Sequence, residues 1–273
     1  TKMKTPALKA LHHRAWIAII IPFIAITFFI IARTIVNSVD YHNSDFFTFW
    51  LSGRLASQGL NPYDSQVWIA GHQQYGATWM PNETFIYPLQ VSLLFIPLGL
   101  LDLFQAYILW DVLLQFMILT AIILLALAAG NQSVKPYYLP LIGGAVIFRP
   151  TLVSLTNGQF SGFLLLILAV MVYLWEKGKW TQGAVLLPFL ALKPNLGVPI
   201  IAFLVVYLLQ QKKTAALLAG AVSGLFLLLV GWIQNPRWLS GFWNAGNAKL
   251  SQMFGFSPNI WGVSAHLCDY HKN

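Results

Sequence analysis

Charge is what this sequence has least of: charged residues make up 9% of the 273-residue chain, and only 8 residues are Asp or Glu. A soluble globular domain carries roughly 25% charged residues, so the composition excludes an ordinary soluble protein. Hydrophobic residues make up 58% of the chain, and several apolar runs approach the roughly 20 residues of a membrane-spanning helix. Segments of alternating hydrophobicity, the signature of outer-membrane barrels, do not occur. The sequence therefore predicts an all-α, polytopic transmembrane helix bundle.

Cysteine is almost absent as well, since Cys268 is the one cysteine of the chain. A single cysteine excludes an internal disulfide and a cysteine-based metal cluster. The sequence has no P-loop, no paired metal-binding acids and no histidine cluster, so we expect no metal, no nucleotide and no other cofactor. The net charge of +8 does not indicate nucleic acid, because the basic residues are scattered and several flank apolar runs, as membrane topology requires.

The order of apolar and polar segments predicts a single integral membrane domain over 1–273. Residues 15–36 form the first span, and the basic residues before it place the start of the chain in the cytoplasm. Residues 37–86 form an external loop in which two amphipathic helices, 45–58 and 65–76, lie at the membrane interface.

Residues 87–235 hold the remaining spans and re-entrant helices. We expect 87–101 to enter the membrane, 103–129 to leave it, and 138–156, broken at "FRP", to form two short or re-entrant helices. Residues 160–175 then go inward, and a hairpin broken at "KPN" and an outward span follow. Residues 236–273 form an external loop or the start of a truncated C-terminal part. This path gathers polar side chains at the external end of the bundle: Asp45, Asn157, Gln159, Lys193, Asn195 and Arg237.

Two roles are open for Asp45. Asp is a good N-cap residue, and it precedes a helical stretch; spacing alone favours this role. The alternative is a general base at the membrane surface, beside aromatic residues that restrict water, and the two roles can coexist. Asp40 is the nearby competitor, read as a solvated loop acid.

Lys193 and Arg149 are the cationic candidates, and each is followed by proline. A charge between apolar runs is costly, which makes Lys193 a candidate for function, although its ammonium could instead reach the lipid headgroups from a helix end. For Arg149, a functional role and a purely structural role are equally favoured. Gln159, in "TNGQ", lies at a helix start, where free N–H groups can hold a phosphate or sugar oxygen.

The order of these motifs resembles glycosyltransferase family 87. An Asp after the first span, an aromatic helix, "GLNPYD", "YPLQ" at re-entry, and the stretch from "NGQF" to "ALKPN" carry the resemblance over most of 37–235. The family has the GT-C membrane architecture. The resemblance implies an active site on the external face of the membrane, which we expect to be a bacterial plasma membrane. Family members carry further spans after "NPRW".

The resemblance implies an inverting transfer of a hexose, such as mannose, from a polyprenyl-phosphate donor to a glycolipid or glycan acceptor. Asp45 would be the base that deprotonates the acceptor hydroxyl. Lys193 and Arg149 would stabilise the departing lipid phosphate, and Asn157, Gln159 and Asn195 would contact sugar or phosphate, with no metal needed.

Two other functions are compatible with the sequence. One is a non-catalytic subunit that keeps this fold as a scaffold in a membrane complex. In that case the chain would bind other proteins of the complex as well as membrane lipids. The other is a transporter, which is disfavoured because the polar residues gather at one membrane face and no acid is seen at the midplane.

Overall fold

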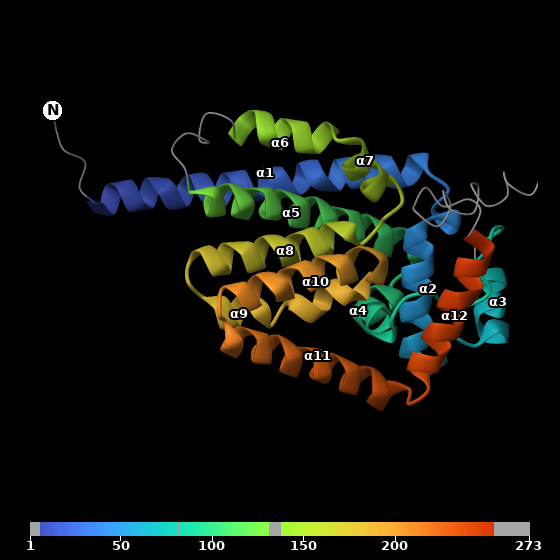
Figure 1. Ribbon diagram of the computed structural model, residues 1–273. Coiled ribbons are helices and arrows are strands. Elements are labelled where there is room, and N and C mark those ends of the chain that lie inside the picture. Colours follow the sequence, from blue (N-terminus) through green and yellow to red (C-terminus); the bar gives the residue numbers. More distant parts are fainter. Residues whose placement is uncertain (1–5, 81, 131–137, 254–273) are drawn as a thin grey trace, which may run out of the picture.

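The computed structural model describes residues 6–80, 82–130 and 138–253 (Figure 1). Within these ranges the regular elements are all helices, which confirms the all-α prediction. Cys268 and the rest of 254–273 lie outside the described residues.

Among the described residues, three segments are long and apolar enough to cross a membrane: Ala18–Ser38 of α1 (Pro6–Ser38), α5 (Leu103–Ala129) and α11 (Thr214–Gln234). They confirm a membrane helix bundle whose first span lies close to the predicted 15–36. Two shorter apolar helices, α8 (Ser161–Glu176) and α10 (Pro194–Gln210), lie alongside them (Figure 1). At about 1.5 Å per residue, these two cover most of the roughly 30 Å hydrocarbon layer.

The helices that do not cross the bundle gather at one end of it, on the right of Figure 1. They are α2 (Asp45–Ser57), α3 (Ser65–Gln74), α4 (Leu89–Gly99) and α12 (Trp238–Met253). We call this the α2 end. The opposite end holds α9 (Trp180–Ala184) and the turn at 211–213, and we call it the α9 end. Residues 238–253 are helical, and whether the part of the chain from 236 is an external loop or the start of a C-terminal part stays a prediction.

The path through 87–156 differs from the prediction. Helix α4 stays at the α2 end, and α5 begins there, because the indole of Trp50 in α2 donates to the carbonyl of Leu101 at 3.2 Å. Helix α5 then runs toward the α9 end, antiparallel to α1 (Figure 1). Helices α6 (Tyr138–Ile147) and α7 (Arg149–Thr156) return to the α2 end. The prediction had 87–101 cross the bundle and 138–156 not cross it, and the structure shows the reverse. The number of crossings before α8 is therefore the same, and α8 runs in the predicted direction.

Helix α2 is buried almost all round, with ten of its 13 residues in the interior. A surface helix would bury one face only, so the helix predicted at 45–58 is present but is not amphipathic. Helix α3 fits that description better, since its buried residues are Trp68, Gly71 and His72.

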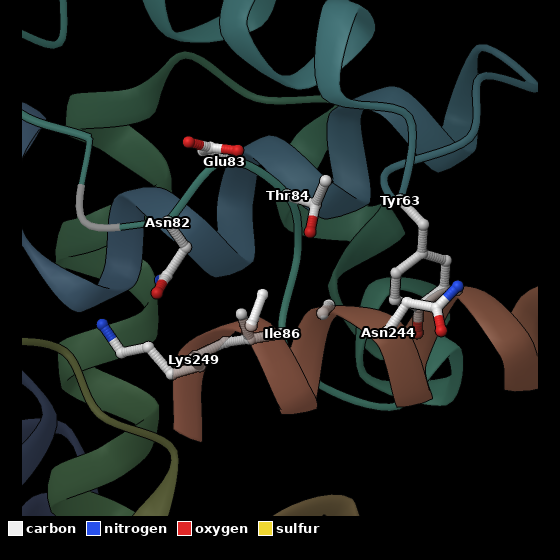
Figure 2. A pocket seen from close by; sticks show the side chains of 10 residues that line it. Tyr63, Asn82, Glu83, Thr84, Ile86, Asn244 and Lys249 are labelled. Atoms are coloured by element: carbon white, nitrogen blue, oxygen red, sulfur yellow. The ribbon is translucent and has the colours of Figure 1, made fainter. Parts of the chain in front are cut away.

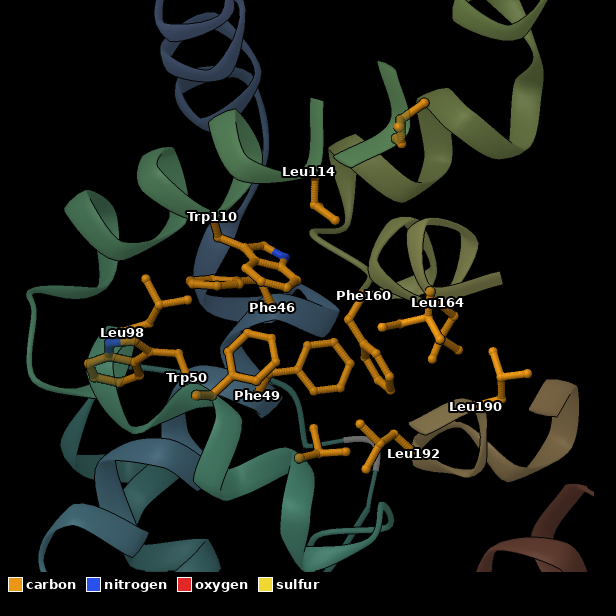
Figure 3. Packing of buried hydrophobic residues seen from close by; sticks show 14 of the residues in the cluster. Phe46, Phe49, Trp50, Leu98, Trp110, Leu114, Phe160, Leu164, Leu190 and Leu192 are labelled. Atoms are coloured by element: carbon orange, nitrogen blue, oxygen red, sulfur yellow. The ribbon is translucent and has the colours of Figure 1, made fainter. Parts of the chain in front are cut away.

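Aromatic side chains fill the space between α2, α4, α5 and the turn before α8 (Figure 3). Phe46 stacks on Tyr107 with ring centroids 4.5 Å apart, and Phe49 meets Phe160 edge to face at 5.0 Å. At Gly53, a Cβ atom would lie 2.4 Å from the carbonyl oxygen of Phe95. The backbones of α2 and α4 are therefore in direct contact, and α2 is packed into the interior at this end of the bundle.

Candidate functional site

A chain of polar contacts joins three distant parts of the sequence at the α2 end. The side-chain amide of Gln159 donates from Nε2 to the carboxylate of Asp45. Its Oε1 accepts from the Lys193 ammonium at 2.6 Å. The amide thus presents its donor to the anion and its acceptor to the cation, as the charges require. The predicted convergence of Asp45, Gln159 and Lys193 is confirmed.

Asp45 is the first residue of α2, and the residue before it is the N-cap. The hydroxyl oxygen of Ser44 accepts from the backbone N–H of Phe47 at 3.3 Å. The reading of Asp45 as the cap is therefore wrong, and its carboxylate is available for other contacts. Its place in the first turn is still favourable, because the helix dipole stabilises a negative charge there. Asp45 is half-buried.

The turn that holds Gln159 is a Schellman motif at the end of α7. The N–H of Gly158 bonds to the carbonyl of Leu155 at 3.2 Å, and the N–H of Gln159 bonds to that of Ser154 at 2.8 Å. Gly158 has φ +61°, and a Cβ atom there would lie 2.5 Å from Cβ of Phe46. The backbone N–H of Gln159 is therefore already used, contrary to the expectation of a free N–H, and its side chain carries the site.

Three consecutive carbonyls fix this turn to α2 and α5. The Tyr107 hydroxyl donates to Thr156 at 2.9 Å, and the Trp110 indole donates to Gly158 at 2.8 Å. Between them, the carbonyl of Asn157 accepts from the N–H of Phe46 at 3.0 Å. The unpaired donors at the start of α2 are thus partly satisfied by the turn. Asn157 contributes through its backbone to the position of Gln159.

Lys193 lies at the break between the 3-10 helix Leu187–Leu192 and α10. Pro194 has no N–H to donate and suits the first position of a helix. The Lys193 side chain is only 8% exposed. Its ammonium donates to Gln159 and, at 2.9 Å, to the hydroxyl of Ser161. These contacts use two of its three donors and leave the third for a ligand.

Tyr87 is a further residue of the site that sequence reasoning missed. Burial raises the pKa of its hydroxyl, and the negative charge of Asp45 raises it further. Its ring contacts those of Phe49 and Phe160 at 5.1 Å and 5.6 Å. Tyr107, Trp110 and Ser161 were missed too. A signal was present, because buried Tyr and Trp side chains need a partner for their polar atom.

Two predicted residues are not brought to this cluster. Arg149 opens α7 and is exposed, seven residues, or about 10 Å of helix, from the turn at its far end. Asn195 is exposed in the first turn of α10. Their proposed contacts with donor sugar or phosphate remain predictions.

An apolar groove of about 420 Å³ adjoins Lys193. Leu192 and Pro194, on either side of the lysine, both line it, and its walls come from α4, α10, α11 and α12. Gln90 also lines the groove, held by a bond from its Nε2 to the carbonyl of Leu227 at 2.8 Å. Lys193 itself does not line the groove, and its ammonium bonds to Gln159 and Ser161 instead.

One acid lies inside a membrane-spanning helix. Asp111 of α5 is fully buried, and its Oδ2 accepts from Nε2 of Gln115 at 3.2 Å. The same nitrogen donates to the carbonyl of Phe28 in α1 at 3.1 Å, so this pair ties α5 to α1. Asp111 lies in a packed helix contact, eight residues after the start of α5, and the absence of an acid at the membrane midplane stays a prediction.

In the described parts of the chain, no group of three or more His, Cys, Asp or Glu residues is placed to hold a metal ion.

Comparison with known proteins gives a family match. Residues 85–270 match the profile of glycosyltransferase family 87. No curated protein and no solved structure matches the chain. The matched segment contains Gln159 and Lys193, and Asp45 precedes it, so Asp45 joins the site through geometry. The match covers more than half of the 273 residues, and the chain therefore belongs to glycosyltransferase family 87.

Proposed function

We propose that this membrane glycosyltransferase moves a hexose, such as mannose, from a polyprenyl-phosphate donor to an extracytoplasmic acceptor, with inversion at the anomeric carbon. The observation that carries the proposal is the polar chain from Asp45 through Gln159 to Lys193. It holds one carboxylate and one ammonium at opposite ends of a single amide.

Asp45 acts as the general base. Its carboxylate takes the proton of the acceptor hydroxyl as that oxygen forms a bond to the anomeric carbon. The bond from this carbon to the phosphate oxygen breaks, and its electron pair leaves with the lipid phosphate. In an inverting displacement the base and the leaving group lie on opposite sides of the carbon. Two opposite charges held apart by one amide suit that requirement.

Lys193 stabilises the charge that develops on the departing phosphate. A cation that is already held in place in a water-poor site stabilises developing negative charge more strongly than the same cation in water does. Its two contacts, with Gln159 and Ser161, hold the ammonium in place. The apolar groove beside it, about 420 Å³ in volume, suits the first isoprene units of the donor lipid.

The charge distribution supports an extracytoplasmic site. Four lysines lie in the turns at the α9 end, namely Lys177, Lys179, Lys212 and Lys213. Short cytoplasmic loops carry an excess of Lys and Arg. This rule favours a cytoplasmic α9 end and therefore supports an α2 end, with Asp45, on the external side of the membrane.

Native mass spectrometry of protein released from its own membranes tests the donor. The account expects a bound polyprenyl phosphate or its hexose derivative in the wild type, and less of it in Lys193→Met. A preparation that holds only phospholipids would overturn the lipid donor. A wild type that binds this lipid but transfers no sugar to any membrane component would favour the scaffold function.

A further inference from the structure

A second cavity lies at the α2 end, separate from the groove beside Lys193. Its volume is about 230 Å³. One wall is the segment 82–86, the other is α12, and Tyr63 lies between them (Figure 2). Six of its lining residues carry polar groups: Tyr63, Asn82, Glu83, Thr84, Asn244 and Lys249. We call it the Tyr63 cavity.

The sequence "NPY" at 61–63 builds this cavity. Oδ1 of Asn61 accepts from the side-chain amide of Asn235, just before α12, at 3.1 Å. The carbonyl of Pro62 accepts from the N–H of Phe85 at 3.1 Å, which fixes the opposite wall. Helix α12 comes so close to Tyr63 that a Cβ atom at Gly241 would lie 2.8 Å from Cβ of the tyrosine. Two walls that are distant in sequence are thus held by three adjacent residues.

The lining combines space with unsatisfied hydrogen-bonding capacity. Helix α12 contributes Ala245 and Ala248 to the cavity, and these short side chains leave room. Oδ1 of Asn82 is buried and has no hydrogen-bond partner among the described residues. The carbonyl of Asn82 accepts from the Trp68 indole at 3.1 Å, so its backbone is held in place. A buried acceptor without a partner is unfavourable, and rotation of the Asn82 side chain toward the cavity would let a ligand hydroxyl satisfy it.

The Tyr63 cavity is connected to Asp45 through one residue. Ile86 lines the cavity, and the next residue, Tyr87, lies near enough to Asp45 for that charge to raise its pKa, after the larger effect of burial. The Tyr63 hydroxyl donates to the carbonyl of Tyr87 at 2.6 Å. Tyr87 thus lies between the cavity, which it meets through its carbonyl, and Phe160, whose ring it contacts and which adjoins Gln159 of the site.

We propose that the Tyr63 cavity binds one neutral sugar ring of the acceptor, next to the ring whose hydroxyl meets Asp45. This rests on the proposed function. Amides, a hydroxyl and a carboxylate beside an aromatic ring are the groups that hold sugar hydroxyls. Glu83 and Lys249 balance in charge, which suits a neutral ligand rather than a phosphate. The volume is below the roughly 300–1,000 Å³ of pockets for drug-sized ligands, so it suits a single ring.

Saturation-transfer NMR with methyl α-D-mannopyranoside and methyl α-D-glucopyranoside tests this on the full chain in nanodiscs. Wild type should transfer saturation to ring protons of at least one glycoside. Asn244→Ala should weaken that binding about two- to tenfold, as expected for the loss of one hydrogen bond. Asn247→Ala is the matched control, because Asn247 is also exposed on α12 but does not line the cavity, and it should bind as wild type does. Ala248→Phe should fill the cavity and abolish binding without lowering the thermal unfolding midpoint.

This test does not depend on turnover. Asp45→Asn should bind the glycosides like wild type. Glycoside binding by a wild type that transfers no sugar would contradict the proposed function and still support the cavity as a sugar site. Absence of saturation transfer with both glycosides would overturn the cavity proposal. Equal weakening by Asn244→Ala and Asn247→Ala, or displacement of the glycosides by inorganic phosphate, would overturn it as well.

Discussion

Lys193 is a charged side chain that is 8% exposed in a chain with few charges. Burial of a charge is costly unless hydrogen bonds and opposite charge compensate for it. Here Gln159 and Ser161 supply the hydrogen bonds, and Asp45 supplies the opposite charge at the far end of the amide. A snorkelling lysine would place its ammonium at the surface instead. The buried ammonium therefore favours anion binding over headgroup contact.

Lys193→Met should weaken binding of a short-chain polyprenyl phosphate. A hydrogen bond to a charged group is worth about 1.5–3 kcal/mol, which corresponds to a loss of roughly ten- to 150-fold in affinity. Lys213→Met is a matched control, because that ammonium lies over the Trp180 ring at the α9 end. Titration of purified protein with the lipid measures both. Equal affinities for wild type and Lys193→Met would leave the lysine without a role in donor binding.

The residues of the site show what spacing can and cannot predict. Asp45, Gln159 and Lys193 were found because polar residues that interrupt apolar runs are costly and few. Spacing could not distinguish Ser44 from Asp45 as the cap of α2, since both are good N-cap residues. Tyr107 and Trp110 were missed because aromatic residues are common here, at 15% of the chain. Their hydrogen bonds to the 156–158 carbonyls depend on the tertiary fold.

At the scale of elements, the turn between α7 and α8 places Gln159, and Gly158 is its most constrained residue. Gly178 provides a comparison, because it has a similar φ of +74° but no atom within 4 Å of an added Cβ. A non-glycine residue with positive φ costs about 1–2 kcal/mol. At Gly158 the methyl group would in addition collide with Phe46 and with Tyr107.

Gly158→Ala should therefore lower the thermal unfolding midpoint clearly more than Gly178→Ala does, and it should reduce sugar transfer as well. Thermal unfolding of both variants in the same detergent, followed by an assay of the folded protein, measures this. Similar midpoints for the two variants would contradict the close packing of the turn on α2 and α5.

The path from 87 to 156 shows the limit of hydropathy. The run after Tyr87 is as apolar as a span, but its helix, α4, has only 11 residues, or about 16 Å at 1.5 Å per residue. Its apolar surface packs on α2 within the protein, and hydropathy does not distinguish burial in protein from burial in lipid. The break at "FRP" was predicted, yet α6 and α7 together still return along the bundle.

Cysteine labelling tests this path in a Cys268→Ser background. Leu100 is 65% exposed at the end of α4. We expect Leu100→Cys to be labelled from the same side of the membrane as Ser65→Cys, and Thr214→Cys from the opposite side. If Leu100→Cys were labelled together with Thr214→Cys, α4 would have to cross the membrane and the position of α5 would be wrong.

At the scale of the whole molecule, the bundle brings three separate segments to one end and leaves the lysine-rich turns at the other. The carboxylate comes from α2, the amide from the α7–α8 turn and the ammonium from the break before α10. The apolar groove and the Tyr63 cavity open at the same end. Under the proposed function, the groove would take the lipid of the donor and the Tyr63 cavity would take a sugar ring of the acceptor.

The most direct test of this account is the rate of sugar transfer by Asp45→Asn. Ser44 caps α2, and an Asn amide oxygen can still accept from Gln159, so the fold and the unfolding midpoint should stay unchanged. Asparagine cannot take up the acceptor proton, however, and general-base catalysis typically contributes about 10²–10⁴-fold. The matched control is Asp40→Asn, since Asp40 is exposed and bonds to Asn43.

The measurement is transfer of radiolabelled hexose from polyprenyl phosphate to extracted membrane glycolipids by wild type and the two variants. The account predicts transfer slower by at least about a hundredfold in Asp45→Asn, with donor binding retained, and near-normal transfer in Asp40→Asn. Near-normal transfer by a folded Asp45→Asn protein would contradict it.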